Sequence, residues 1–180
     1  KRPDGRTADV EMRRPPDGVL VQRARRGSNA AVAELFERHW QGAWRAALAI
    51  TGRADVAEDV AQDGFERAFR ALDRFDTTRP FAPWLHRIVV NRALDLMRQD
   101  RRLVSLETVP EPIAADDVDH HDIDVVRAFA TLTPDRRAVC VLRYGLGYSP
   151  PEIAELLDVP LGTVHSRLAR ALADLRVQME

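Results

Sequence analysis

The sequence is poor in cysteine and in aromatic residues. Its 180 residues include one cysteine, Cys140, which lies in the apolar run VCVL. A single cysteine excludes a disulfide framework, and the apolar neighbours predict a buried thiol. Aromatic residues make up 6% of the chain, although 45% of it is hydrophobic. This balance is typical of a helical protein whose cores consist mainly of Ala, Leu and Val.

Long apolar runs are also missing. No run approaches the roughly 18 residues that are needed to cross a bilayer. The amino-terminal segment KRPDGRTADVEMRRPPDG is charged and has no apolar stretch of the kind found in signal peptides. We therefore expect a cytoplasmic protein with no membrane insertion. Residues 1–16 are expected to form a disordered tail or an extension, because Met12 is a candidate for the true start.

Signatures of catalysis are absent as well. There is no phosphate-binding glycine loop, no Ser/His/Asp set and no cysteine cluster. The run DDVDHHDID contains common metal ligands, so a metal-dependent hydrolase is one interpretation. The run is acidic and aperiodic, however, whereas ligands are usually held by ordered structure and supporting side chains. We expect no metal, no cofactor and no enzymatic activity.

The net charge of −1 does not by itself indicate a nucleic-acid-binding protein, but it conceals a strong segregation of charge. Residues 79–102 carry six arginines against two aspartates. Residues 103–126 carry seven acidic residues and no Lys or Arg. The chain thus contains one basic segment followed directly by one acidic segment.

Hydrophobic periodicity favours helix almost throughout and shows no convincing alternating strand. In the first part of the chain Ser28 or Asn29 is a helix cap, and Thr51-Gly52 ends that helix. Expected helices of this part cover residues 19–26, 28–50, 54–72 and 83–99. They predict an amino-terminal helical bundle over residues 17–102.

Residues 103–124 are acidic, contain proline and lack periodicity, which predicts a flexible linker. Helical patterns resume after it, and Ser149 with Glu152 has the spacing of a capping box. The predicted fold is therefore all-α, with two small helical domains joined by an acidic flexible linker. The second domain is expected over residues 125–180.

The stretch PPEIAELLDVPLGTVHSRLARAL contains two short helices separated by a tight turn. Pro160 is expected to begin the second helix, and Gly162 would let its backbone approach a phosphate. The second helix presents one polar face, formed by Thr163, His165, Ser166, Arg167 and Arg170. This pattern is typical of a helix-turn-helix whose second helix enters the major groove. The alternative is an ordinary helical hairpin with a solvated face.

Two further patterns allow a functional and a purely structural interpretation. In ADVAEDVAQDGFERAFRAL, acidic and amide side chains recur at helical spacing, either as a solvated face or as a docking surface for a basic partner. In RPFAPWLHRIVVNRALDLMRQDRR, aromatic and basic residues alternate. Such a mixture suits unpaired DNA, because rings stack on bases and Arg follows phosphates. A core role for Trp84 is the alternative.

Three motifs resemble bacterial sigma factors of RNA polymerase, in particular the extracytoplasmic-function (ECF) group. The run P-x-G-T-V-x-S-R-x-x-R, after E-I-A-x-x-L, is similar to their promoter-binding domain. The run D-x-A-E-D-x-x-Q-D-x-F is similar to the helix that binds the clamp coiled coil of the polymerase. The run F-x-x-W-L-x-x-I-x-x-N-x-x-x-D is similar to the segment that recognises and melts the minus-ten element.

The resemblance implies three sets of contact residues. Contacts to the minus-thirty-five element fall on Thr163, His165, Ser166, Arg167 and Arg170. Contacts to the minus-ten element fall on Phe81, Trp84, Arg87 and Asn91, the first two by stacking or wedging. Contacts to core polymerase fall on Asp55, Glu58, Asp59, Gln62 and Asp63. Because His165 and Ala169 depart from the residues common in relatives, base preference is not carried over.

The resemblance thus implies an alternative sigma factor with core RNA polymerase, promoter DNA and an anti-sigma factor as its partners. The acidic linker would thread into positively charged channels of the polymerase, where it would mimic nucleic acid. The runner-up interpretation is a stand-alone helix-turn-helix transcriptional regulator, which would bind a palindrome as a dimer without polymerase.

Overall fold

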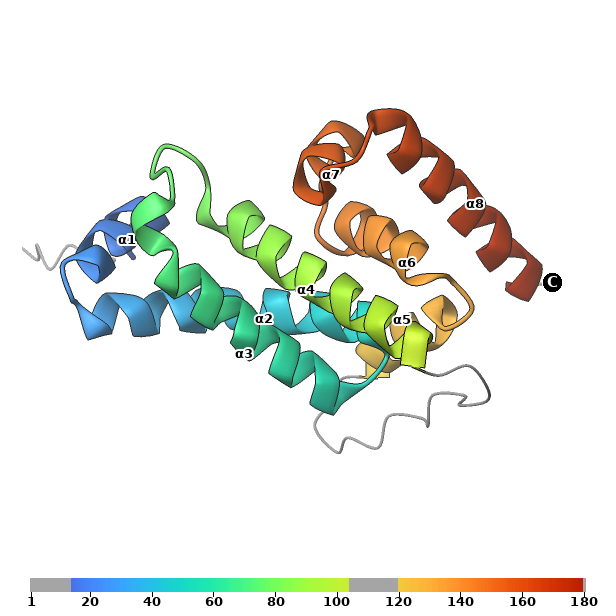
Figure 1. Cartoon of the computed structure of the whole chain (residues 1–180), viewed down its shortest axis with the longest axis horizontal. Coiled ribbons are helices and arrows are strands. Elements are labelled where there is room, and N and C mark those ends of the chain that lie inside the picture. The colour runs from blue at the N-terminus through green and yellow to red at the C-terminus, as the bar shows by residue number, and fades with distance from the viewer. Residues whose placement is uncertain (1–13, 104–119, 180) are drawn as a thin grey trace, which may run out of the picture.

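The computed structural model describes residues 14–103 and 120–179, which form helices in two groups (Figure 1). The first group comprises α1 (Asp17–Arg25), α2 (Asn29–Thr51), α3 (Ala54–Arg70), the short 3-10 helix η1 (Leu72–Arg74) and α4 (Phe81–Leu103). The second comprises α5 (His120–Phe129), α6 (Pro134–Cys140), the π-helical turn η2 (Val141–Gly145), α7 (Pro150–Leu157) and α8 (Leu161–Met179). The predicted all-α fold with two helical domains is confirmed.

Helix α2 begins and ends where the sequence predicts. The Ser28 hydroxyl oxygen accepts the N–H of Ala31 at 3.3 Å, which satisfies one of the free donors of the first turn. At the other end Gly52 adopts a left-handed φ of 74°, and its N–H donates to the carbonyl of Leu48 at 2.8 Å. Glycine suits this position because it has no Cβ to oppose a positive φ.

Two predicted helix starts are wrong by one or two residues. Helix α4 begins at Phe81 rather than at Pro83, and it runs beyond the expected end at residue 99. Pro83 is tolerated because the first four N–H groups of a helix have no intrahelical partner. Pro160 precedes α8 and caps it through its carbonyl oxygen, which accepts the N–H of Thr163 at 2.9 Å.

In the first domain α2, α3 and α4 pack against one another around a core rich in alanine. Gly64 permits the close approach of α3 to α4. A Cβ at this position would lie 2.5 Å from a Cγ of the buried Val89. Small residues therefore set the spacing of these helices.

In the second domain α7 is closed at its start by the predicted capping box. The backbone N–H and the hydroxyl of Ser149 both donate to the carboxylate of Glu152, at 2.7 and 2.6 Å. These bonds hold the pKa of Glu152 below its ordinary value. Asp158 takes a left-handed φ of 53° and turns the chain towards α8. Cys140 is buried as predicted, and burial raises the pKa of its thiol to about 11.

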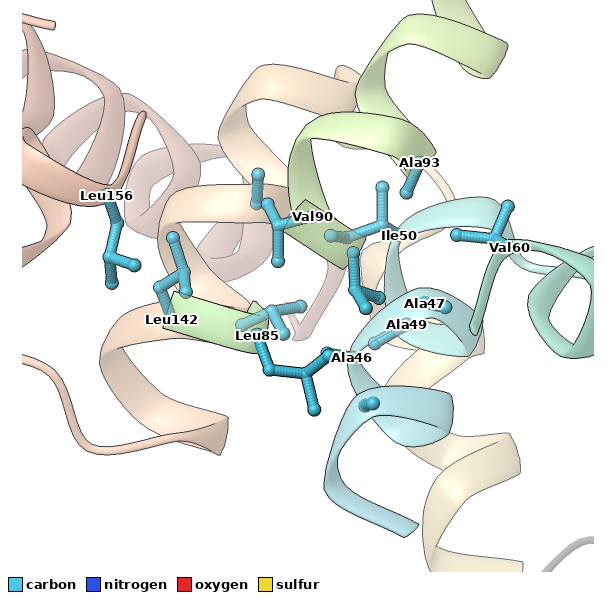
Figure 2. Close-up of a cluster of buried hydrophobic side chains, with 14 of the residues drawn as sticks. Ala46, Ala47, Ala49, Ile50, Val60, Leu85, Val90, Ala93, Leu142 and Leu156 are labelled. Atoms are coloured by element: carbon cyan, nitrogen blue, oxygen red, sulfur yellow. The ribbon is translucent and has the colours of Figure 1, made fainter. Parts of the chain in front are cut away.

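The two domains share one hydrophobic core. Leu142 of η2 lies between Leu156 of α7 and Leu85 of α4 in this core (Figure 2). Figure 1 shows α6 between α4 and α8, so that α8 lies on the outside of the molecule. The N-terminal end of α5, residues 120–124, had been assigned to the linker by its sequence. The rest of the predicted linker and most of the predicted tail lie outside the described residues.

None of the helices in the described ranges is long and apolar enough to span a membrane. The described residues also contain no cluster of three or more His, Cys, Asp or Glu side chains that could hold a metal ion. Most of the run DDVDHHDID falls outside the side chains that the structure describes.

Candidate nucleic-acid interface

Helix α8 is fixed by one face and exposes the other. Val164, Leu168 and Ala171 are buried against the rest of the second domain. His165 and Ser166 lie on the exposed side, and the Ser166 hydroxyl donates to the carbonyl of Thr163 at 3.0 Å. The buried residues thus orient the amino-terminal half of α8 so that its polar face points to solvent.

The predicted contact residues of α8 differ in how free they are. Arg170 is exposed, and Thr163 is half-buried. Arg167 is also half-buried, and its Nη2 lies 3.3 Å from a carboxylate oxygen of Asp135 in α6. Asp135 also accepts a bond at 3.0 Å from Arg98 of α4. Arg167 is therefore engaged within the molecule in this arrangement.

Gly162 in the first turn of α8 has no packing role. A Cβ at this position would meet no atom within 4 Å. Glycine in a helix is less favourable than alanine by about 1 kcal/mol. Internal packing therefore does not account for a glycine here, in contrast to Gly64.

The predicted minus-ten residues of α4 do not share one environment. Phe81 is 1% exposed, and its ring packs against Phe75, His39 and Trp84 at centroid distances of 5.2 to 5.7 Å. Its ring has no face on which a base could stack. Phe81 thus supports Trp84 from within the core.

Trp84, Arg87 and Asn91 remain accessible to different degrees. Trp84 and Asn91 are half-buried, and Arg87 is exposed. Trp84 and Arg87 line a cleft of about 550 Å³ between the two domains. On the other side this cleft is lined by residues of the second domain, namely Tyr148, Glu152, Glu155 and Leu156.

Four of the five predicted polymerase contacts form an exposed stripe on α3. Asp55, Glu58, Asp59 and Gln62 are all exposed. Gln62 donates to Glu58 at 3.2 Å, and Arg53 pairs with Asp55 at 2.6 Å. The bond from Arg53 holds the pKa of Asp55 below its ordinary value. Asp55 is therefore ionised at neutral pH.

Asp63, the fifth predicted contact, has a different role in the fold. It is half-buried and pairs with Arg67 at 2.9 Å and with Arg92 of α4 at 2.6 Å. The bond from Arg67, followed by that from Arg92, lowers the pKa of Asp63. Both of its oxygens are engaged, so Asp63 ties α3 to α4.

The sequence pattern missed an apolar groove beside the acidic stripe. Phe36 of α2 is 36% exposed and stacks on Trp40 at 4.9 Å. Together with Val32 and Phe69 it lines a depression of about 370 Å³. Phe69 follows Gln62 at helical spacing, so the groove continues the stripe of α3. Periodicity alone could not reveal that Phe36 lies at the edge of the core.

Comparison with known proteins gives both domains a family. Sigma-70 region 2 matches residues 35–103, and Sigma-70 region 4 matches residues 123–175. The ECF RNA polymerase sigma factor SigW of Bacillus subtilis is 31% identical over 88% of this chain and 94% of its own length.

Two solved structures have a similar fold. A structure of CnrH in complex with the cytosolic domain of CnrY has a TM-score of 0.68, with 32% identity over 91% of this chain and 96% of that one. The sigma factor RpoE of Bartonella quintana, solved with the anti-sigma factor NepR, has a TM-score of 0.66. Its identity is 25% over 82% of this chain and 95% of that one.

The stripe of α3 and the Trp84 surface of α4 thus fall in region 2, and the exposed face of α8 falls in region 4. These regions carry the non-enzymatic task of directing RNA polymerase to promoters and starting transcription there. The chain belongs to the ECF sigma factors of RNA polymerase.

Proposed function

We propose that this ECF sigma factor divides its task among three surfaces: the α3 stripe for core polymerase, the Trp84 surface for the minus-ten element and the α8 face for the minus-thirty-five element. The observation that carries the proposal is that each surface exposes polar side chains that the packing of the fold does not need. The α3 stripe and α8 also lie on different sides of the molecule (Figure 1), so both can be engaged at once.

Core polymerase docks on the α3 stripe. Asp55, Glu58 and Asp59 offer exposed carboxylates to a basic partner, and complementary charge accelerates such an encounter and fixes its register. The groove at Phe36 adds an apolar anchor beside the charges, which suits an interface with an apolar centre and a polar rim. Asp63 contributes by fixing the position of α3 on α4 rather than by direct contact.

The minus-thirty-five element is bound by α8 in the major groove. His165, Ser166 and Arg170 face outward from the first half of the helix, where a recognition helix meets base edges. Gly162 lets the helix start approach a phosphate closely, which explains a glycine that the fold does not require. Arg167 joins these contacts when its ion pair with Asp135 breaks.

The minus-ten element is bound by Trp84, Arg87 and Asn91. The indole of Trp84 offers a stacking platform for an unpaired base, and Arg87 a charge for the backbone. Because a base must leave the duplex to reach such a platform, its capture stabilises melted DNA. Phe81 holds Trp84 in position through ring contact within the core.

We further propose that the chain acts in the cytoplasm and has an anti-sigma partner. The relative RpoE was crystallised with the anti-sigma factor NepR, and CnrH was solved in complex with the cytosolic domain of CnrY. Their similarity in fold supports a partner of the same class for this chain.

Run-off transcription tests this function. Purified core polymerase is given candidate promoter templates with and without the chain, and the chain is also tested for DNA binding without polymerase. We expect a promoter-specific transcript only when both proteins are present. Tight, sequence-specific binding by the free chain, together with no transcript, would instead support a stand-alone regulator.

A further inference from the structure

Helix α1 lies beside η1 (Figure 1), and one arginine at its end holds the loop that leads into α4. In the last turn of α1 the guanidinium of Arg25 donates to the carbonyl of Leu72, through Nε at 3.0 Å and through Nη2 at 2.8 Å. The same Nη2 also donates to the carbonyl of Phe75. Leu72 lies in η1, and Phe75 begins the loop of residues 75–80, which joins η1 to α4. Arg25 therefore fixes the point at which this loop starts.

The other end of α1 touches the same loop. A Cβ at Gly18 would lie only 3.2 Å from the carbonyl oxygen of Thr77, which is closer than an ordinary van der Waals contact. The neighbouring Asp17 is bound to α2, because its carboxylate accepts bonds from Arg38 at 3.1 Å and from His39 at 2.8 Å. Helix α1 is thus anchored on α2 and meets the loop at both of its own ends.

The loop has a turn of its own. The carboxylate of Asp76 accepts the hydroxyl of Thr78 at 2.7 Å and its N–H at 2.9 Å, and these bonds hold the pKa of Asp76 below its ordinary value. Both bonds lie within the loop. Its pair with the second domain, Arg79 with Glu155 at 2.9 Å, is exposed, and exposed pairs contribute little. The placement of the loop therefore depends mainly on its two ends.

The start of the loop also determines where Trp84 lies. The ring of Phe75 is 4.8 Å from that of Trp84, whereas the ring of Phe81 is 5.7 Å from it. Phe75 is buried, and its carbonyl is held by Arg25. A chain of two contacts therefore leads from Arg25 to the proposed stacking platform, although the two residues lie on different helices. Such supporting contacts keep a binding group in the geometry that its ligand requires.

The other arginines at the end of α1 have no comparable contact. Arg23 and Arg26 are exposed, and their side chains make no hydrogen bond or ion pair with the residues that the structure describes. All three arginines would interact favourably with the helix dipole. Charge at the end of α1 does not explain why Arg25 alone binds two carbonyls of another segment.

We propose that Arg25 is a positioning residue for the minus-ten element: by holding the carbonyls of Leu72 and Phe75 it fixes the 75–80 loop and, through Phe75, the Trp84 platform for an unpaired base. This inference rests on the proposed function of Trp84. In this role Arg25 does not bind DNA itself and acts through the loop.

Binding of a single-stranded oligonucleotide to the holoenzyme tests the proposal. The probe carries the non-template minus-ten sequence of a promoter that the wild-type holoenzyme transcribes, and fluorescence anisotropy measures its affinity. Arg25→Ala should weaken binding roughly 10-fold, within the range expected for a lost stacking contact. Affinity for core polymerase and for a minus-thirty-five duplex should stay unchanged, because Arg25 holds neither the α3 stripe nor α8.

Three further variants separate positioning from charge. Arg23→Ala removes the same charge from the same turn of α1 and should leave binding unchanged. Arg25→Lys keeps the charge but lacks the planar fork of donors, so it should lose only part of the affinity. Gly18→Ala pushes a methyl group against Thr77 and should weaken binding by displacing the loop from its other side.

A double-mutant cycle shows whether Arg25 acts through Trp84. Residues that act as a unit give non-additive losses, whereas independent residues give additive ones. Arg25→Ala should therefore weaken binding by less than about 2-fold when residue 84 is already alanine. A general loss of stability would not depend on Trp84 in this way.

Each result bears on either Arg25 or Trp84. Unchanged binding by Arg25→Ala, or an equal loss with and without Trp84, would overturn the proposal and leave the function of Trp84 standing. Equal losses for Arg23→Ala and Arg25→Ala would also overturn it, because charge alone would then explain both. If Arg25→Ala does not fold, Arg25→Lys is used in the same cycle with the same expectation. If Trp84→Ala binds the oligonucleotide as well as the wild type, the function proposed for Trp84 fails, and the role of Arg25 fails with it.

Discussion

The two surfaces proposed to bind DNA differ in what lies over them. The outward face of α8 carries His165, Ser166 and Arg170 in the open, whereas Trp84 and Arg87 of α4 face the carboxylates of α7 across a cleft. The same second domain that presents one surface therefore forms the opposite wall of the cleft beside the other. The composition of each surface alone does not reveal this difference in surroundings.

The largest effect is expected on the α3 stripe, the proposed docking surface for core polymerase. Glu58→Arg with Asp59→Arg reverses two exposed carboxylates of α3, and like charges across an interface cost several kcal/mol. Affinity for core polymerase should fall by about 100-fold or more, measured by fluorescence anisotropy. The control Asp73→Arg with Asp124→Arg makes the same charge change at exposed sites off α3 and outside the groove at Phe36. Equal loss in both variants would show that α3 is not the docking surface.

Acid should destabilise the contact between His86 of α4 and Tyr148 of the second domain. Burial lowers the pKa of His86 from its ordinary value of 6.5 to about 4, with a further contribution from His39. Between these two pH values the unfolded chain binds a proton that the folded chain does not, so stability falls as the pH drops from 6.5 through 4. The full loss is about 3 kcal/mol.

Urea unfolding at a series of pH values measures this effect. His86→Gln should remove most of the loss between pH 6.5 and 4, because no imidazole is left to protonate. An unchanged pH profile in that variant would assign the acid sensitivity to other groups. The α8 face should keep its local order over the same range.

Replacing Trp84 should affect only the surface proposed to bind the minus-ten element. Stacking on an aromatic side chain contributes about 1–3 kcal/mol per base, so Trp84→Ala should reduce open-complex formation by the holoenzyme roughly 10- to 100-fold. Fluorescence of 2-aminopurine in the minus-ten element reports the melting. Trp84→Tyr should retain most of it. If Trp84→Ala melts promoters normally, Trp84 has only a core role.

The smallest change is expected from Gly162→Ala in the first turn of α8. Nothing lies within 4 Å of the new methyl group, so the free energy of unfolding should stay equal or rise by up to about 1 kcal/mol. Affinity for minus-thirty-five DNA should nevertheless fall about 10-fold, because the backbone can no longer approach a phosphate as closely. Undiminished affinity would remove the proposed role of Gly162.

Gly64→Ala is the matched control for that substitution. Its methyl group would overlap the buried Val89, and overpacking of this kind costs about 1–3 kcal/mol. Chemical denaturation should therefore show a loss of stability for Gly64→Ala and none for Gly162→Ala. The pair distinguishes a glycine required by the fold from one required by a ligand.

Local features were predictable from the sequence, while contacts between distant segments were not. Ser28, Gly52 and the pair Ser149–Glu152 act within a few residues, so their types and spacing suffice. Arg137 and Ile50 are separated by 87 residues, and His86 and Tyr148 by 62. Periodicity tells which side of a helix is buried, but it does not tell which other helix lies there.

The candidate sites show the same limit. Motif resemblance selected Phe81 and Asp63 together with their exposed neighbours, because a motif does not record burial. The structure places Phe81 in the core and engages Asp63 with Arg92. The neighbouring Trp84 and Asp59 remain accessible, which follows from their positions on the helix surface.

The most direct test measures how a single-stranded oligonucleotide with the minus-ten sequence of a transcribed promoter binds three samples. These are the holoenzyme, the holoenzyme carrying Trp84→Ala and core polymerase alone, compared by fluorescence anisotropy at fixed salt. We predict tight binding to the holoenzyme, binding roughly 10- to 100-fold weaker to the Trp84→Ala holoenzyme and no sequence-specific binding to core polymerase. Equal binding to the two holoenzymes would contradict the assignment of the minus-ten element to the Trp84 surface.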